Sequence, residues 1–125
     1  MPTDHLLLAV ALARRGAAFV VVGSAVDRLV TGRGLPADLD ILVPPRAVPA
    51  LARALTDLTG SPVRLHRLMA HDSSRFLTWL GPIDVFVDDV AGPSTVILVD
   101  GTWLRVTTGP HPVARHADAQ ERTSV

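Results

Sequence analysis

The feature that most constrains the fold is a series of short apolar runs that carry few charges. They lie at residues 18–22, 38–43, 83–88, 95–99 and 102–106. Runs of this length that are rich in Val and Ile are typical of β-strands, and a run that is apolar throughout predicts a strand buried on both faces. Helical patterns surround the first two runs, whereas turn residues separate the later ones. This order predicts an α+β domain with a mixed β-sheet flanked by helices.

Three segments have the periodicity of amphipathic helices. Residues 3–15 are expected to start at a capping Thr3 or Asp4 and to stop at Gly16. A second helix is expected to start at Ser24, where Asp27 three residues later resembles a capping box. Residues 46–58 predict a third helix. The expected apolar faces are, in chain order, Leu7, Val10 and Ala11, then Val26, Leu29 and Val30, then Val48, Leu51, Leu55 and Leu58.

The second half of the chain reads as strands joined by hairpins. Residues 62–68 predict a strand, and 74–80 and 83–88 predict two more, joined at Gly81-Pro82. Asp100-Gly101 lies between two apolar runs, which is the strongest short signal for a β-hairpin. The edge of this hairpin is open to pairing with another copy, so a homodimer is one alternative.

Composition limits the classes of function. The chain has 125 residues, 48% of them hydrophobic, which fits one folded domain; we assign it to 1–107, with a polar tail at 108–125. The formal net charge is zero, which argues against a general electrostatic grip on nucleic acid. Lysine and cysteine are absent, which excludes lysine- or thiol-based chemistry. The apolar run near the N-terminus is too short to span a membrane, and we expect a cytoplasmic protein without a membrane partner.

Two aspartates open one of the buried strands. In the segment DLDILV, alternation places Asp38 and Asp40 on one side of the strand and the apolar side chains, beginning with Leu39, on the other. Two carboxylates that close repel each other and raise each other's pKa. A bound divalent cation removes the repulsion, and Mg²⁺ prefers such hard oxygen ligands.

Asp84 is a third acid near the start of an apolar strand. If that strand neighbours 38–43, three carboxylates converge and can hold two metal ions. Gly23 and Ser24 lie between a strand and a helix, where exposed N–H groups and the helix dipole favour a phosphate. Arg28 and Arg33 follow closely, and either can pair with phosphate, although a solvated side chain or an ion pair with Asp27 is the simpler interpretation.

The order of these motifs resembles the nucleotidyltransferase superfamily of the DNA polymerase β type. An apolar strand, GS, a helix, DLD opening a strand and a later ID match its core over about residues 18–90. The members it is most similar to are minimal nucleotidyltransferases, antibiotic nucleotidyltransferases and the toxins of toxin–antitoxin systems. The resemblance implies the nucleotidyltransferase fold, a triphosphate bound by Gly23 and Ser24, and metal ions held by Asp38, Asp40 and Asp84. The implied reaction moves a nucleoside monophosphate from an NTP to a hydroxyl acceptor and releases pyrophosphate.

Alternative interpretations remain at each position. Ser24 by itself is a helix cap, Asp38 a loop residue, and Asp84 a turn acid, with Asp88 as its substitute. The glycines after Gly23 lack the spacing of a dinucleotide-binding motif. Nothing in residues 91–125 resembles the helical acceptor domain of many relatives. An inactive or regulatory binding module that acts with a partner protein is therefore the alternative to an enzyme.

Overall fold

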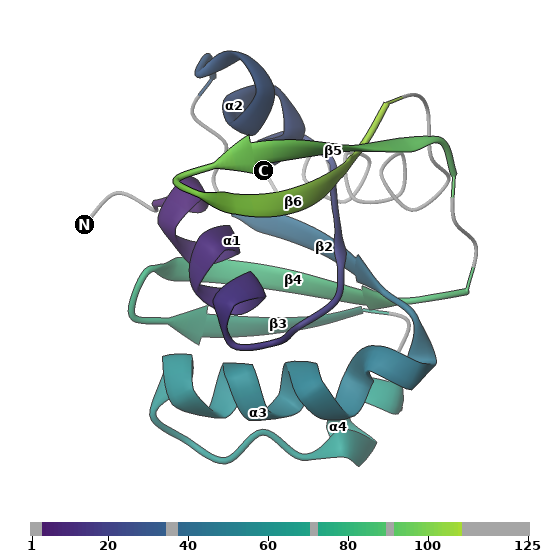
Figure 1. Cartoon of the computed structure of the whole chain (residues 1–125). Coiled ribbons are helices and arrows are strands. Elements are labelled where there is room, and N and C mark those ends of the chain that lie inside the picture. The colour runs from purple at the N-terminus through teal and green to yellow at the C-terminus, as the bar shows by residue number, and fades with distance from the viewer. Residues whose placement is uncertain (1–3, 35–37, 71–72, 90–91, 109–125) are drawn as a thin grey trace, which may run out of the picture.

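The computed structural model describes residues 4–34, 38–70, 73–89 and 92–108. The part of the chain that it describes forms helices and strands in the order α1, β1, α2, β2, η1, α3, α4, β3, β4, β5 and β6 (Figure 1). The helices are α1 His5–Arg14, α2 Ala25–Thr31, the 3₁₀ helix η1 Pro45–Ala47, α3 Val48–Thr59 and α4 Leu65–Met69. The strands are β1 Val20–Val22, β2 Leu39–Val43, β3 Ser73–Thr78, β4 Gly81–Val87, β5 Ser94–Val99 and β6 Thr102–Thr107.

The strands form one mixed sheet, which confirms the predicted fold class at the level of an α+β domain. Their order is β3-β4-β2-β1-β6-β5. β2 pairs in parallel with β4, and β1 pairs in parallel with β6, whereas β1 and β2 are antiparallel. Antiparallel hairpins, β3–β4 and β5–β6, complete the two sides. The short central strands are thus enclosed by longer ones.

The main core lies on the side of the sheet that carries α1 and α3 (Figure 1). The predicted inner face of α3 is confirmed, because Val48, Leu51, Leu55 and Leu58 are all buried. A smaller apolar cluster lies on the other face and consists of Val22, Leu42 and Phe86, with Val20 packed against it. Alternate residues of β1, β2 and β4 therefore supply two different apolar layers, as the continuous apolar runs predicted.

The ends and faces of the first two helices are partly as predicted. The Asp4 carboxylate accepts a hydrogen bond from the Leu7 N–H at 2.9 Å, which confirms Asp4 as the cap of α1. Leu7 itself is exposed, so its predicted place in the core is wrong; Leu8 and Leu12 are the buried leucines of α1. Val30 in α2 is also exposed, against prediction. Single apolar side chains outside the core are common, because apolar atoms contribute a large part of the surface of a folded protein.

The predicted capping box of α2 is wrong. Ser24 has helical backbone angles and makes no capping hydrogen bond with its side chain, and the Val26 N–H instead donates to the Gly23 carbonyl at 3.2 Å. The turn is therefore closed by the backbone, because Gly23 adopts a φ of +71°. The Ser24 side chain is exposed at this turn.

The strand predicted at 62–68 is also wrong. Residues 65–69 form α4, and Leu68 is its buried residue. Leu65, Leu68 and Met69 are spaced three and four residues apart, a helical pattern that the apolar composition of the segment concealed. Only Leu68 enters the core, since Leu65 and Met69 are exposed.

Of the two predicted hairpin turns, the first is wrong and the second is confirmed. The first turns at Trp79 and Leu80, two residues before the predicted Gly81-Pro82, and both of those residues lie in β4. The Thr78 hydroxyl donates to the Gly81 carbonyl at 2.7 Å and accepts from the Leu80 N–H at 3.1 Å, and these two hydrogen bonds close the turn. The Asp100-Gly101 hairpin is confirmed, with positive φ angles of 50° and 74°.

Two further expectations concern the ends of the chain. The predicted tail at 108–125 lies outside the described residues apart from Thr108. In the described ranges, every helix is too short, or too polar, to cross a lipid bilayer.

Candidate metal centre

Parallel pairing of β2 with β4 brings the predicted acids together. The register aligns Asp40 of β2 with Asp84 of β4, and Asp38 precedes β2 by one residue. One carboxylate oxygen from each of Asp38, Asp40 and Asp84 lies within 4.8 Å of the other two. Neighbouring strands are 4.7–4.9 Å apart, so aligned residues on one face meet without any special loop geometry.

The burial of these acids follows from strand alternation. Leu39, Ile41 and Val43 point into the main core, as predicted. Asp38 and Asp40 are nevertheless only 3% and 1% exposed. Buried carboxylates are costly unless cations or hydrogen bonds compensate their charge. The negative charge of these two carboxylates therefore needs nearby cations or hydrogen-bond donors.

Gly23 lies directly against the Asp40 carboxylate. A Cβ atom at position 23 would lie 2.6 Å from Asp40 Oδ2, closer than real Cβ contacts allow. Pairing of Val22 with Asp40 brings the glycine to this position. The Gly23-Ser24 turn and the acids therefore belong to one site, and the glycine is required there by both its φ and the adjacent carboxylate.

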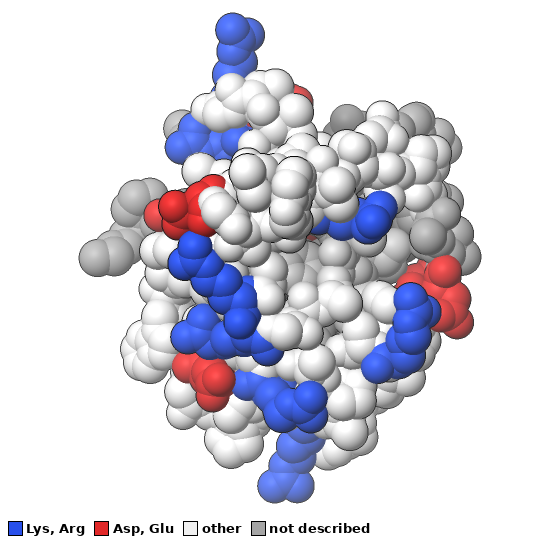
Figure 2. Space-filling model, in the orientation of Figure 1, with Lys and Arg blue, Asp and Glu red and all other residues white. Residues whose placement is uncertain are grey.

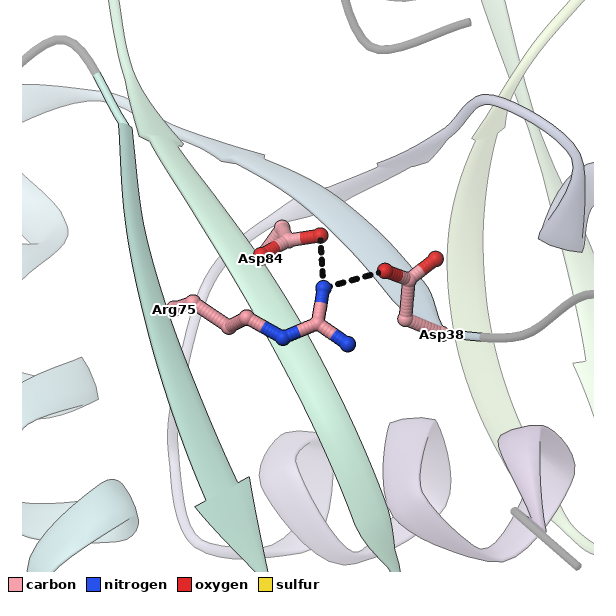
Figure 3. Close-up of polar contacts among 3 residues, drawn as sticks. All are labelled: Asp38, Arg75 and Asp84. Carbon is pink, nitrogen blue, oxygen red and sulfur yellow. Dashed lines mark hydrogen bonds and ion pairs between the residues drawn. The ribbon is translucent and has the colours of Figure 1, made fainter. Parts of the chain in front are cut away.

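Arg75 is the cation of the site, and the sequence analysis missed it. Its Nη1 lies 2.8 Å from Asp38 Oδ2 and 3.2 Å from Asp84 Oδ2. Figure 3 shows the guanidinium extended from β3 across β4 toward both carboxylates. When all three carboxyl groups are ionised, they and the guanidinium carry a net charge of −2 (−3 + 1). The cluster thus retains an electrostatic demand for further positive charge.

Asp84 is the acid whose protonation is most perturbed. Burial, followed by a hydrogen bond to Asp38 and the charge of Asp38, raises the pKa of Asp84 to about 6. Arg75 and a hydrogen bond with Asp40 act in the opposite sense. Asp84 therefore holds a proton more readily than an ordinary aspartate does.

His5 lies next to the site and was also missed. It is buried at the start of α1, and its Nε2 has no hydrogen-bond partner among the described residues. Burial lowers the pKa of His5, although the Asp38 charge and a hydrogen bond to the Asp38 backbone oppose this shift. A single histidine in an apolar helix gives no sequence signal of this contact.

The predicted phosphate-binding arginines make contacts at the end of α2, and Asp88 lies after β4. The Arg28 Nη1 donates to the Gly32 carbonyl at the end of α2. The Arg33 N–H donates to the Thr31 hydroxyl at 3.2 Å, and the Arg33 side chain is exposed. Asp88 directly follows β4, and the acidic cluster contains Asp84 and not Asp88, so Asp88 is not the substitute that the sequence allowed.

The charges elsewhere on the molecule are mixed. Figure 2 shows one face, on which arginines lie next to acidic residues. Arg14 pairs with Asp100 at 3.7 Å, and Arg15 pairs with Asp57 at 3.8 Å. Exposed pairs of this kind contribute little stability. They do offset the positive charge of these two arginines.

Comparisons with protein-family models, with curated proteins and with solved structures found no match. The site is therefore interpreted from its own geometry.

Proposed function

We propose that the protein is a metal-dependent nucleotidyltransferase, with Asp38, Asp40 and Asp84 as the metal ligands. The observation that carries the proposal is the convergence of these three carboxylates within 4.8 Å on two parallel strands. The donor set fits Mg²⁺, which binds one or two carboxylates and completes its shell with water and phosphate oxygens. When bound, the metal ions polarise the transferred phosphoryl group and neutralise the triphosphate.

The chain's own residues have distinct roles in this proposal. The Gly23-Ser24 turn, which lies against Asp40, offers backbone N–H groups and an exposed hydroxyl to the triphosphate. Asp84, as a ligand of the catalytic metal in this proposal, would help to activate the acceptor hydroxyl. Arg28 and Arg33 are close in sequence to this turn, and we retain them as candidate phosphate contacts.

Arg75 occupies the space between two of the proposed ligands. Its side chain is 59% exposed, so it can move outward and leave the carboxylates to a metal ion. We assign it the role of a counter-cation that offsets part of the cluster's charge before metal and NTP bind. This exchange avoids leaving buried carboxylates uncompensated in the resting protein.

The decisive experiment measures transfer from labelled nucleotides. The full chain is incubated with each α-labelled NTP, Mg²⁺ and RNA, protein or small hydroxyl acceptors, and label transfer and pyrophosphate release are measured. We expect both to require Mg²⁺ and to fall on the order of a thousandfold in Asp40→Asn, because metal ions supply several kcal/mol of transition-state stabilisation. Asp27→Asn, which changes an exposed acid in α2, is the control and should retain activity.

A second candidate function is a nucleotide-binding or regulatory module without catalysis. Arg75 favours it, because its guanidinium pairs with both Asp38 and Asp84 and so occupies the space between two of the proposed ligands. Bound Mg²⁺ and NTP without transfer to any acceptor would support this alternative. Failure to bind Mg²⁺ at all, in protein that is folded, would contradict both functions.

A further inference from the structure

The three proposed metal ligands differ in how the sheet holds their backbones. Asp40 and Asp84 form a pair within the ladder between β2 and β4. Asp38 precedes β2, and this ladder begins one residue later, at Leu39. The Asp38 side chain is nevertheless buried, and its carboxylate belongs to the acidic cluster. The direction of this carboxylate therefore depends on contacts outside the ladder.

His5 supplies a contact of this kind from the start of α1. Its ring forms a hydrogen bond with the backbone of Asp38. Burial lowers the pKa of His5, whereas this hydrogen bond acts to raise it, as expected when a ring N–H donates to a carbonyl oxygen. Because Nε2 has no partner among the described residues, the donor is Nδ1. The hydrogen bond therefore runs from His5 Nδ1 to the Asp38 carbonyl.

The start of α1 is itself fixed to the strands of the site. The Asp4 N–H donates to the Leu80 carbonyl at 3.1 Å, and the Asp4 carboxylate caps the helix. Leu80 lies in the turn of the β3–β4 hairpin, whose second strand carries Asp84. His5 directly follows Asp4 and is only 6% exposed, so the surrounding atoms restrict its ring. A helix held at this point can define the position of a neighbouring carbonyl group.

Packing alone does not explain a histidine at this position. A buried polar ring with an unpartnered nitrogen costs free energy, whereas Leu8 and Leu12 fill the core from the same helix without this cost. Metal ligation does not explain it either, because the group of possible ligands in the described part of the chain consists of the three aspartates and not His5. The hydrogen bond to Asp38 is the contact that requires a polar side chain.

We propose that His5 is a positioning residue of the metal centre, which holds the Asp38 carbonyl through Nδ1–H and so directs the Asp38 carboxylate toward Asp40 and Asp84. This inference rests on the proposed function, because it assigns Asp38 to a metal ion. Groups that hold the ligands of a metal in place typically change its affinity by about 10- to 100-fold when they are removed. His5 should therefore affect metal binding without contacting the metal.

Substitutions that imitate one ring nitrogen at a time test the contact. The amide nitrogen of asparagine lies close to the position of Nδ1, and that of glutamine lies close to the position of Nε2. Binding of Mn²⁺, as a probe for Mg²⁺, is measured on the full chain from the electron paramagnetic resonance signal of the free ion. We expect His5→Asn to bind like the wild type. The dissociation constant should rise by about tenfold in His5→Leu and His5→Gln.

Val10→Ala is the matched control. Val10 is buried in the same helix, so its truncation lowers the stability of α1 packing without touching Asp38. Its dissociation constant for Mn²⁺ should equal that of the wild type, and circular dichroism confirms that each variant is folded. Equal dissociation constants in all three His5 variants would overturn the proposal, as would a loss in His5→Asn or a rescue by His5→Gln. A wild type that binds no Mn²⁺ would overturn the metal centre itself and, with it, the role of His5.

The tautomer of His5 gives a second readout that does not depend on a metal ion. Long-range ¹H–¹⁵N correlation spectra of the protein in EDTA, at about pH 8 where imidazole is neutral, distinguish a proton on Nδ1 from one on Nε2. The His5 signals are identified by their absence in His5→Asn. We expect the proton on Nδ1, because the Asp38 carbonyl accepts a hydrogen bond there. A proton on Nε2 would contradict the positioning role even in a protein that binds Mn²⁺.

Discussion

The two sides of the sheet depart from ordinary burial in opposite ways. Where β2, β3 and β4 meet, acidic side chains are buried, with Asp40 only 1% exposed. At the β5–β6 hairpin, apolar side chains are exposed, with Trp103 at 65%. Apolar residues usually prefer the interior and charged residues the surface. The comparison teaches that one side places negative charge where a cation can compensate it, whereas the other leaves apolar surface in contact with solvent.

Gly23 should produce the largest effect on the acidic side. Gly23→Ala introduces a Cβ 2.6 Å from Asp40 Oδ2 at a φ of +71°, so strain and overlap add. We expect a loss of about 3 kcal/mol in the free energy of unfolding, measured by urea denaturation.

Gly32→Ala is a close control for this substitution. Gly32 has a φ of +75°, but a Cβ there would meet nothing within 4 Å. It should cost only the conformational penalty, about 1 kcal/mol. Equal losses in the two variants would show that Asp40 does not constrain position 23.

Arg75 should have the next largest effect. Arg75→Gln removes the cation shared by Asp38 and Asp84, and the nearly buried Asp38 loses its charged partner. We expect a loss of about 1–2 kcal/mol without metal, smaller than for a fully buried pair because Arg75 is largely exposed.

Added Mg²⁺ should restore more stability to this variant than to the wild type, as thermal unfolding with and without EDTA would reveal. Arg15→Gln is the control, since the exposed Arg15–Asp57 pair at 3.8 Å should contribute little. If the Arg75→Gln protein is as stable as the wild type in EDTA, Arg75 does not stabilise the cluster as a counter-cation.

The pH dependence of the metal-free protein should be the smallest effect. The pKa of Asp84 is raised to about 6 in the folded state, above the value near 3.9 of an unfolded aspartate. The folded state therefore binds this proton more tightly, and the stability that results is present below pH 4 and is lost as pH rises through 6.

We expect the stability of the wild type relative to Asp84→Asn to decrease between pH 4 and pH 7 in EDTA, since the asparagine does not titrate. Urea denaturation of both proteins across this range gives the difference directly. If this difference in the free energy of unfolding stays constant or grows with pH, ionisation of Asp84 does not destabilise the folded protein.

Register explains why the acids were predicted and Arg75 was not. The three carboxylates needed strand alternation, which the apolar runs indicated, and the adjacency of two strands, which the sequence analysis took as a condition and the structure supplies. Arg75 required the exact position of the hairpin turn. A turn at Gly81-Pro82 would pair Arg75 with Asp88, whereas the observed turn at Trp79-Leu80 pairs it with Asp84. A displacement of two residues at a turn thus changes the partner of every residue in the hairpin.

The sequence by itself determined the α+β class, the β5–β6 hairpin, the inner face of α3 and the alternation that separates Asp40 from Ile41. These follow from local periodicity and turn chemistry, which act over a few residues. Only the tertiary structure decided the strand order, the contact of Gly23 with Asp40, the place of His5 and the link from Arg75 to two carboxylates. These depend on segments far apart in the chain, and their free energies arise from burial and charge compensation after the strands have paired.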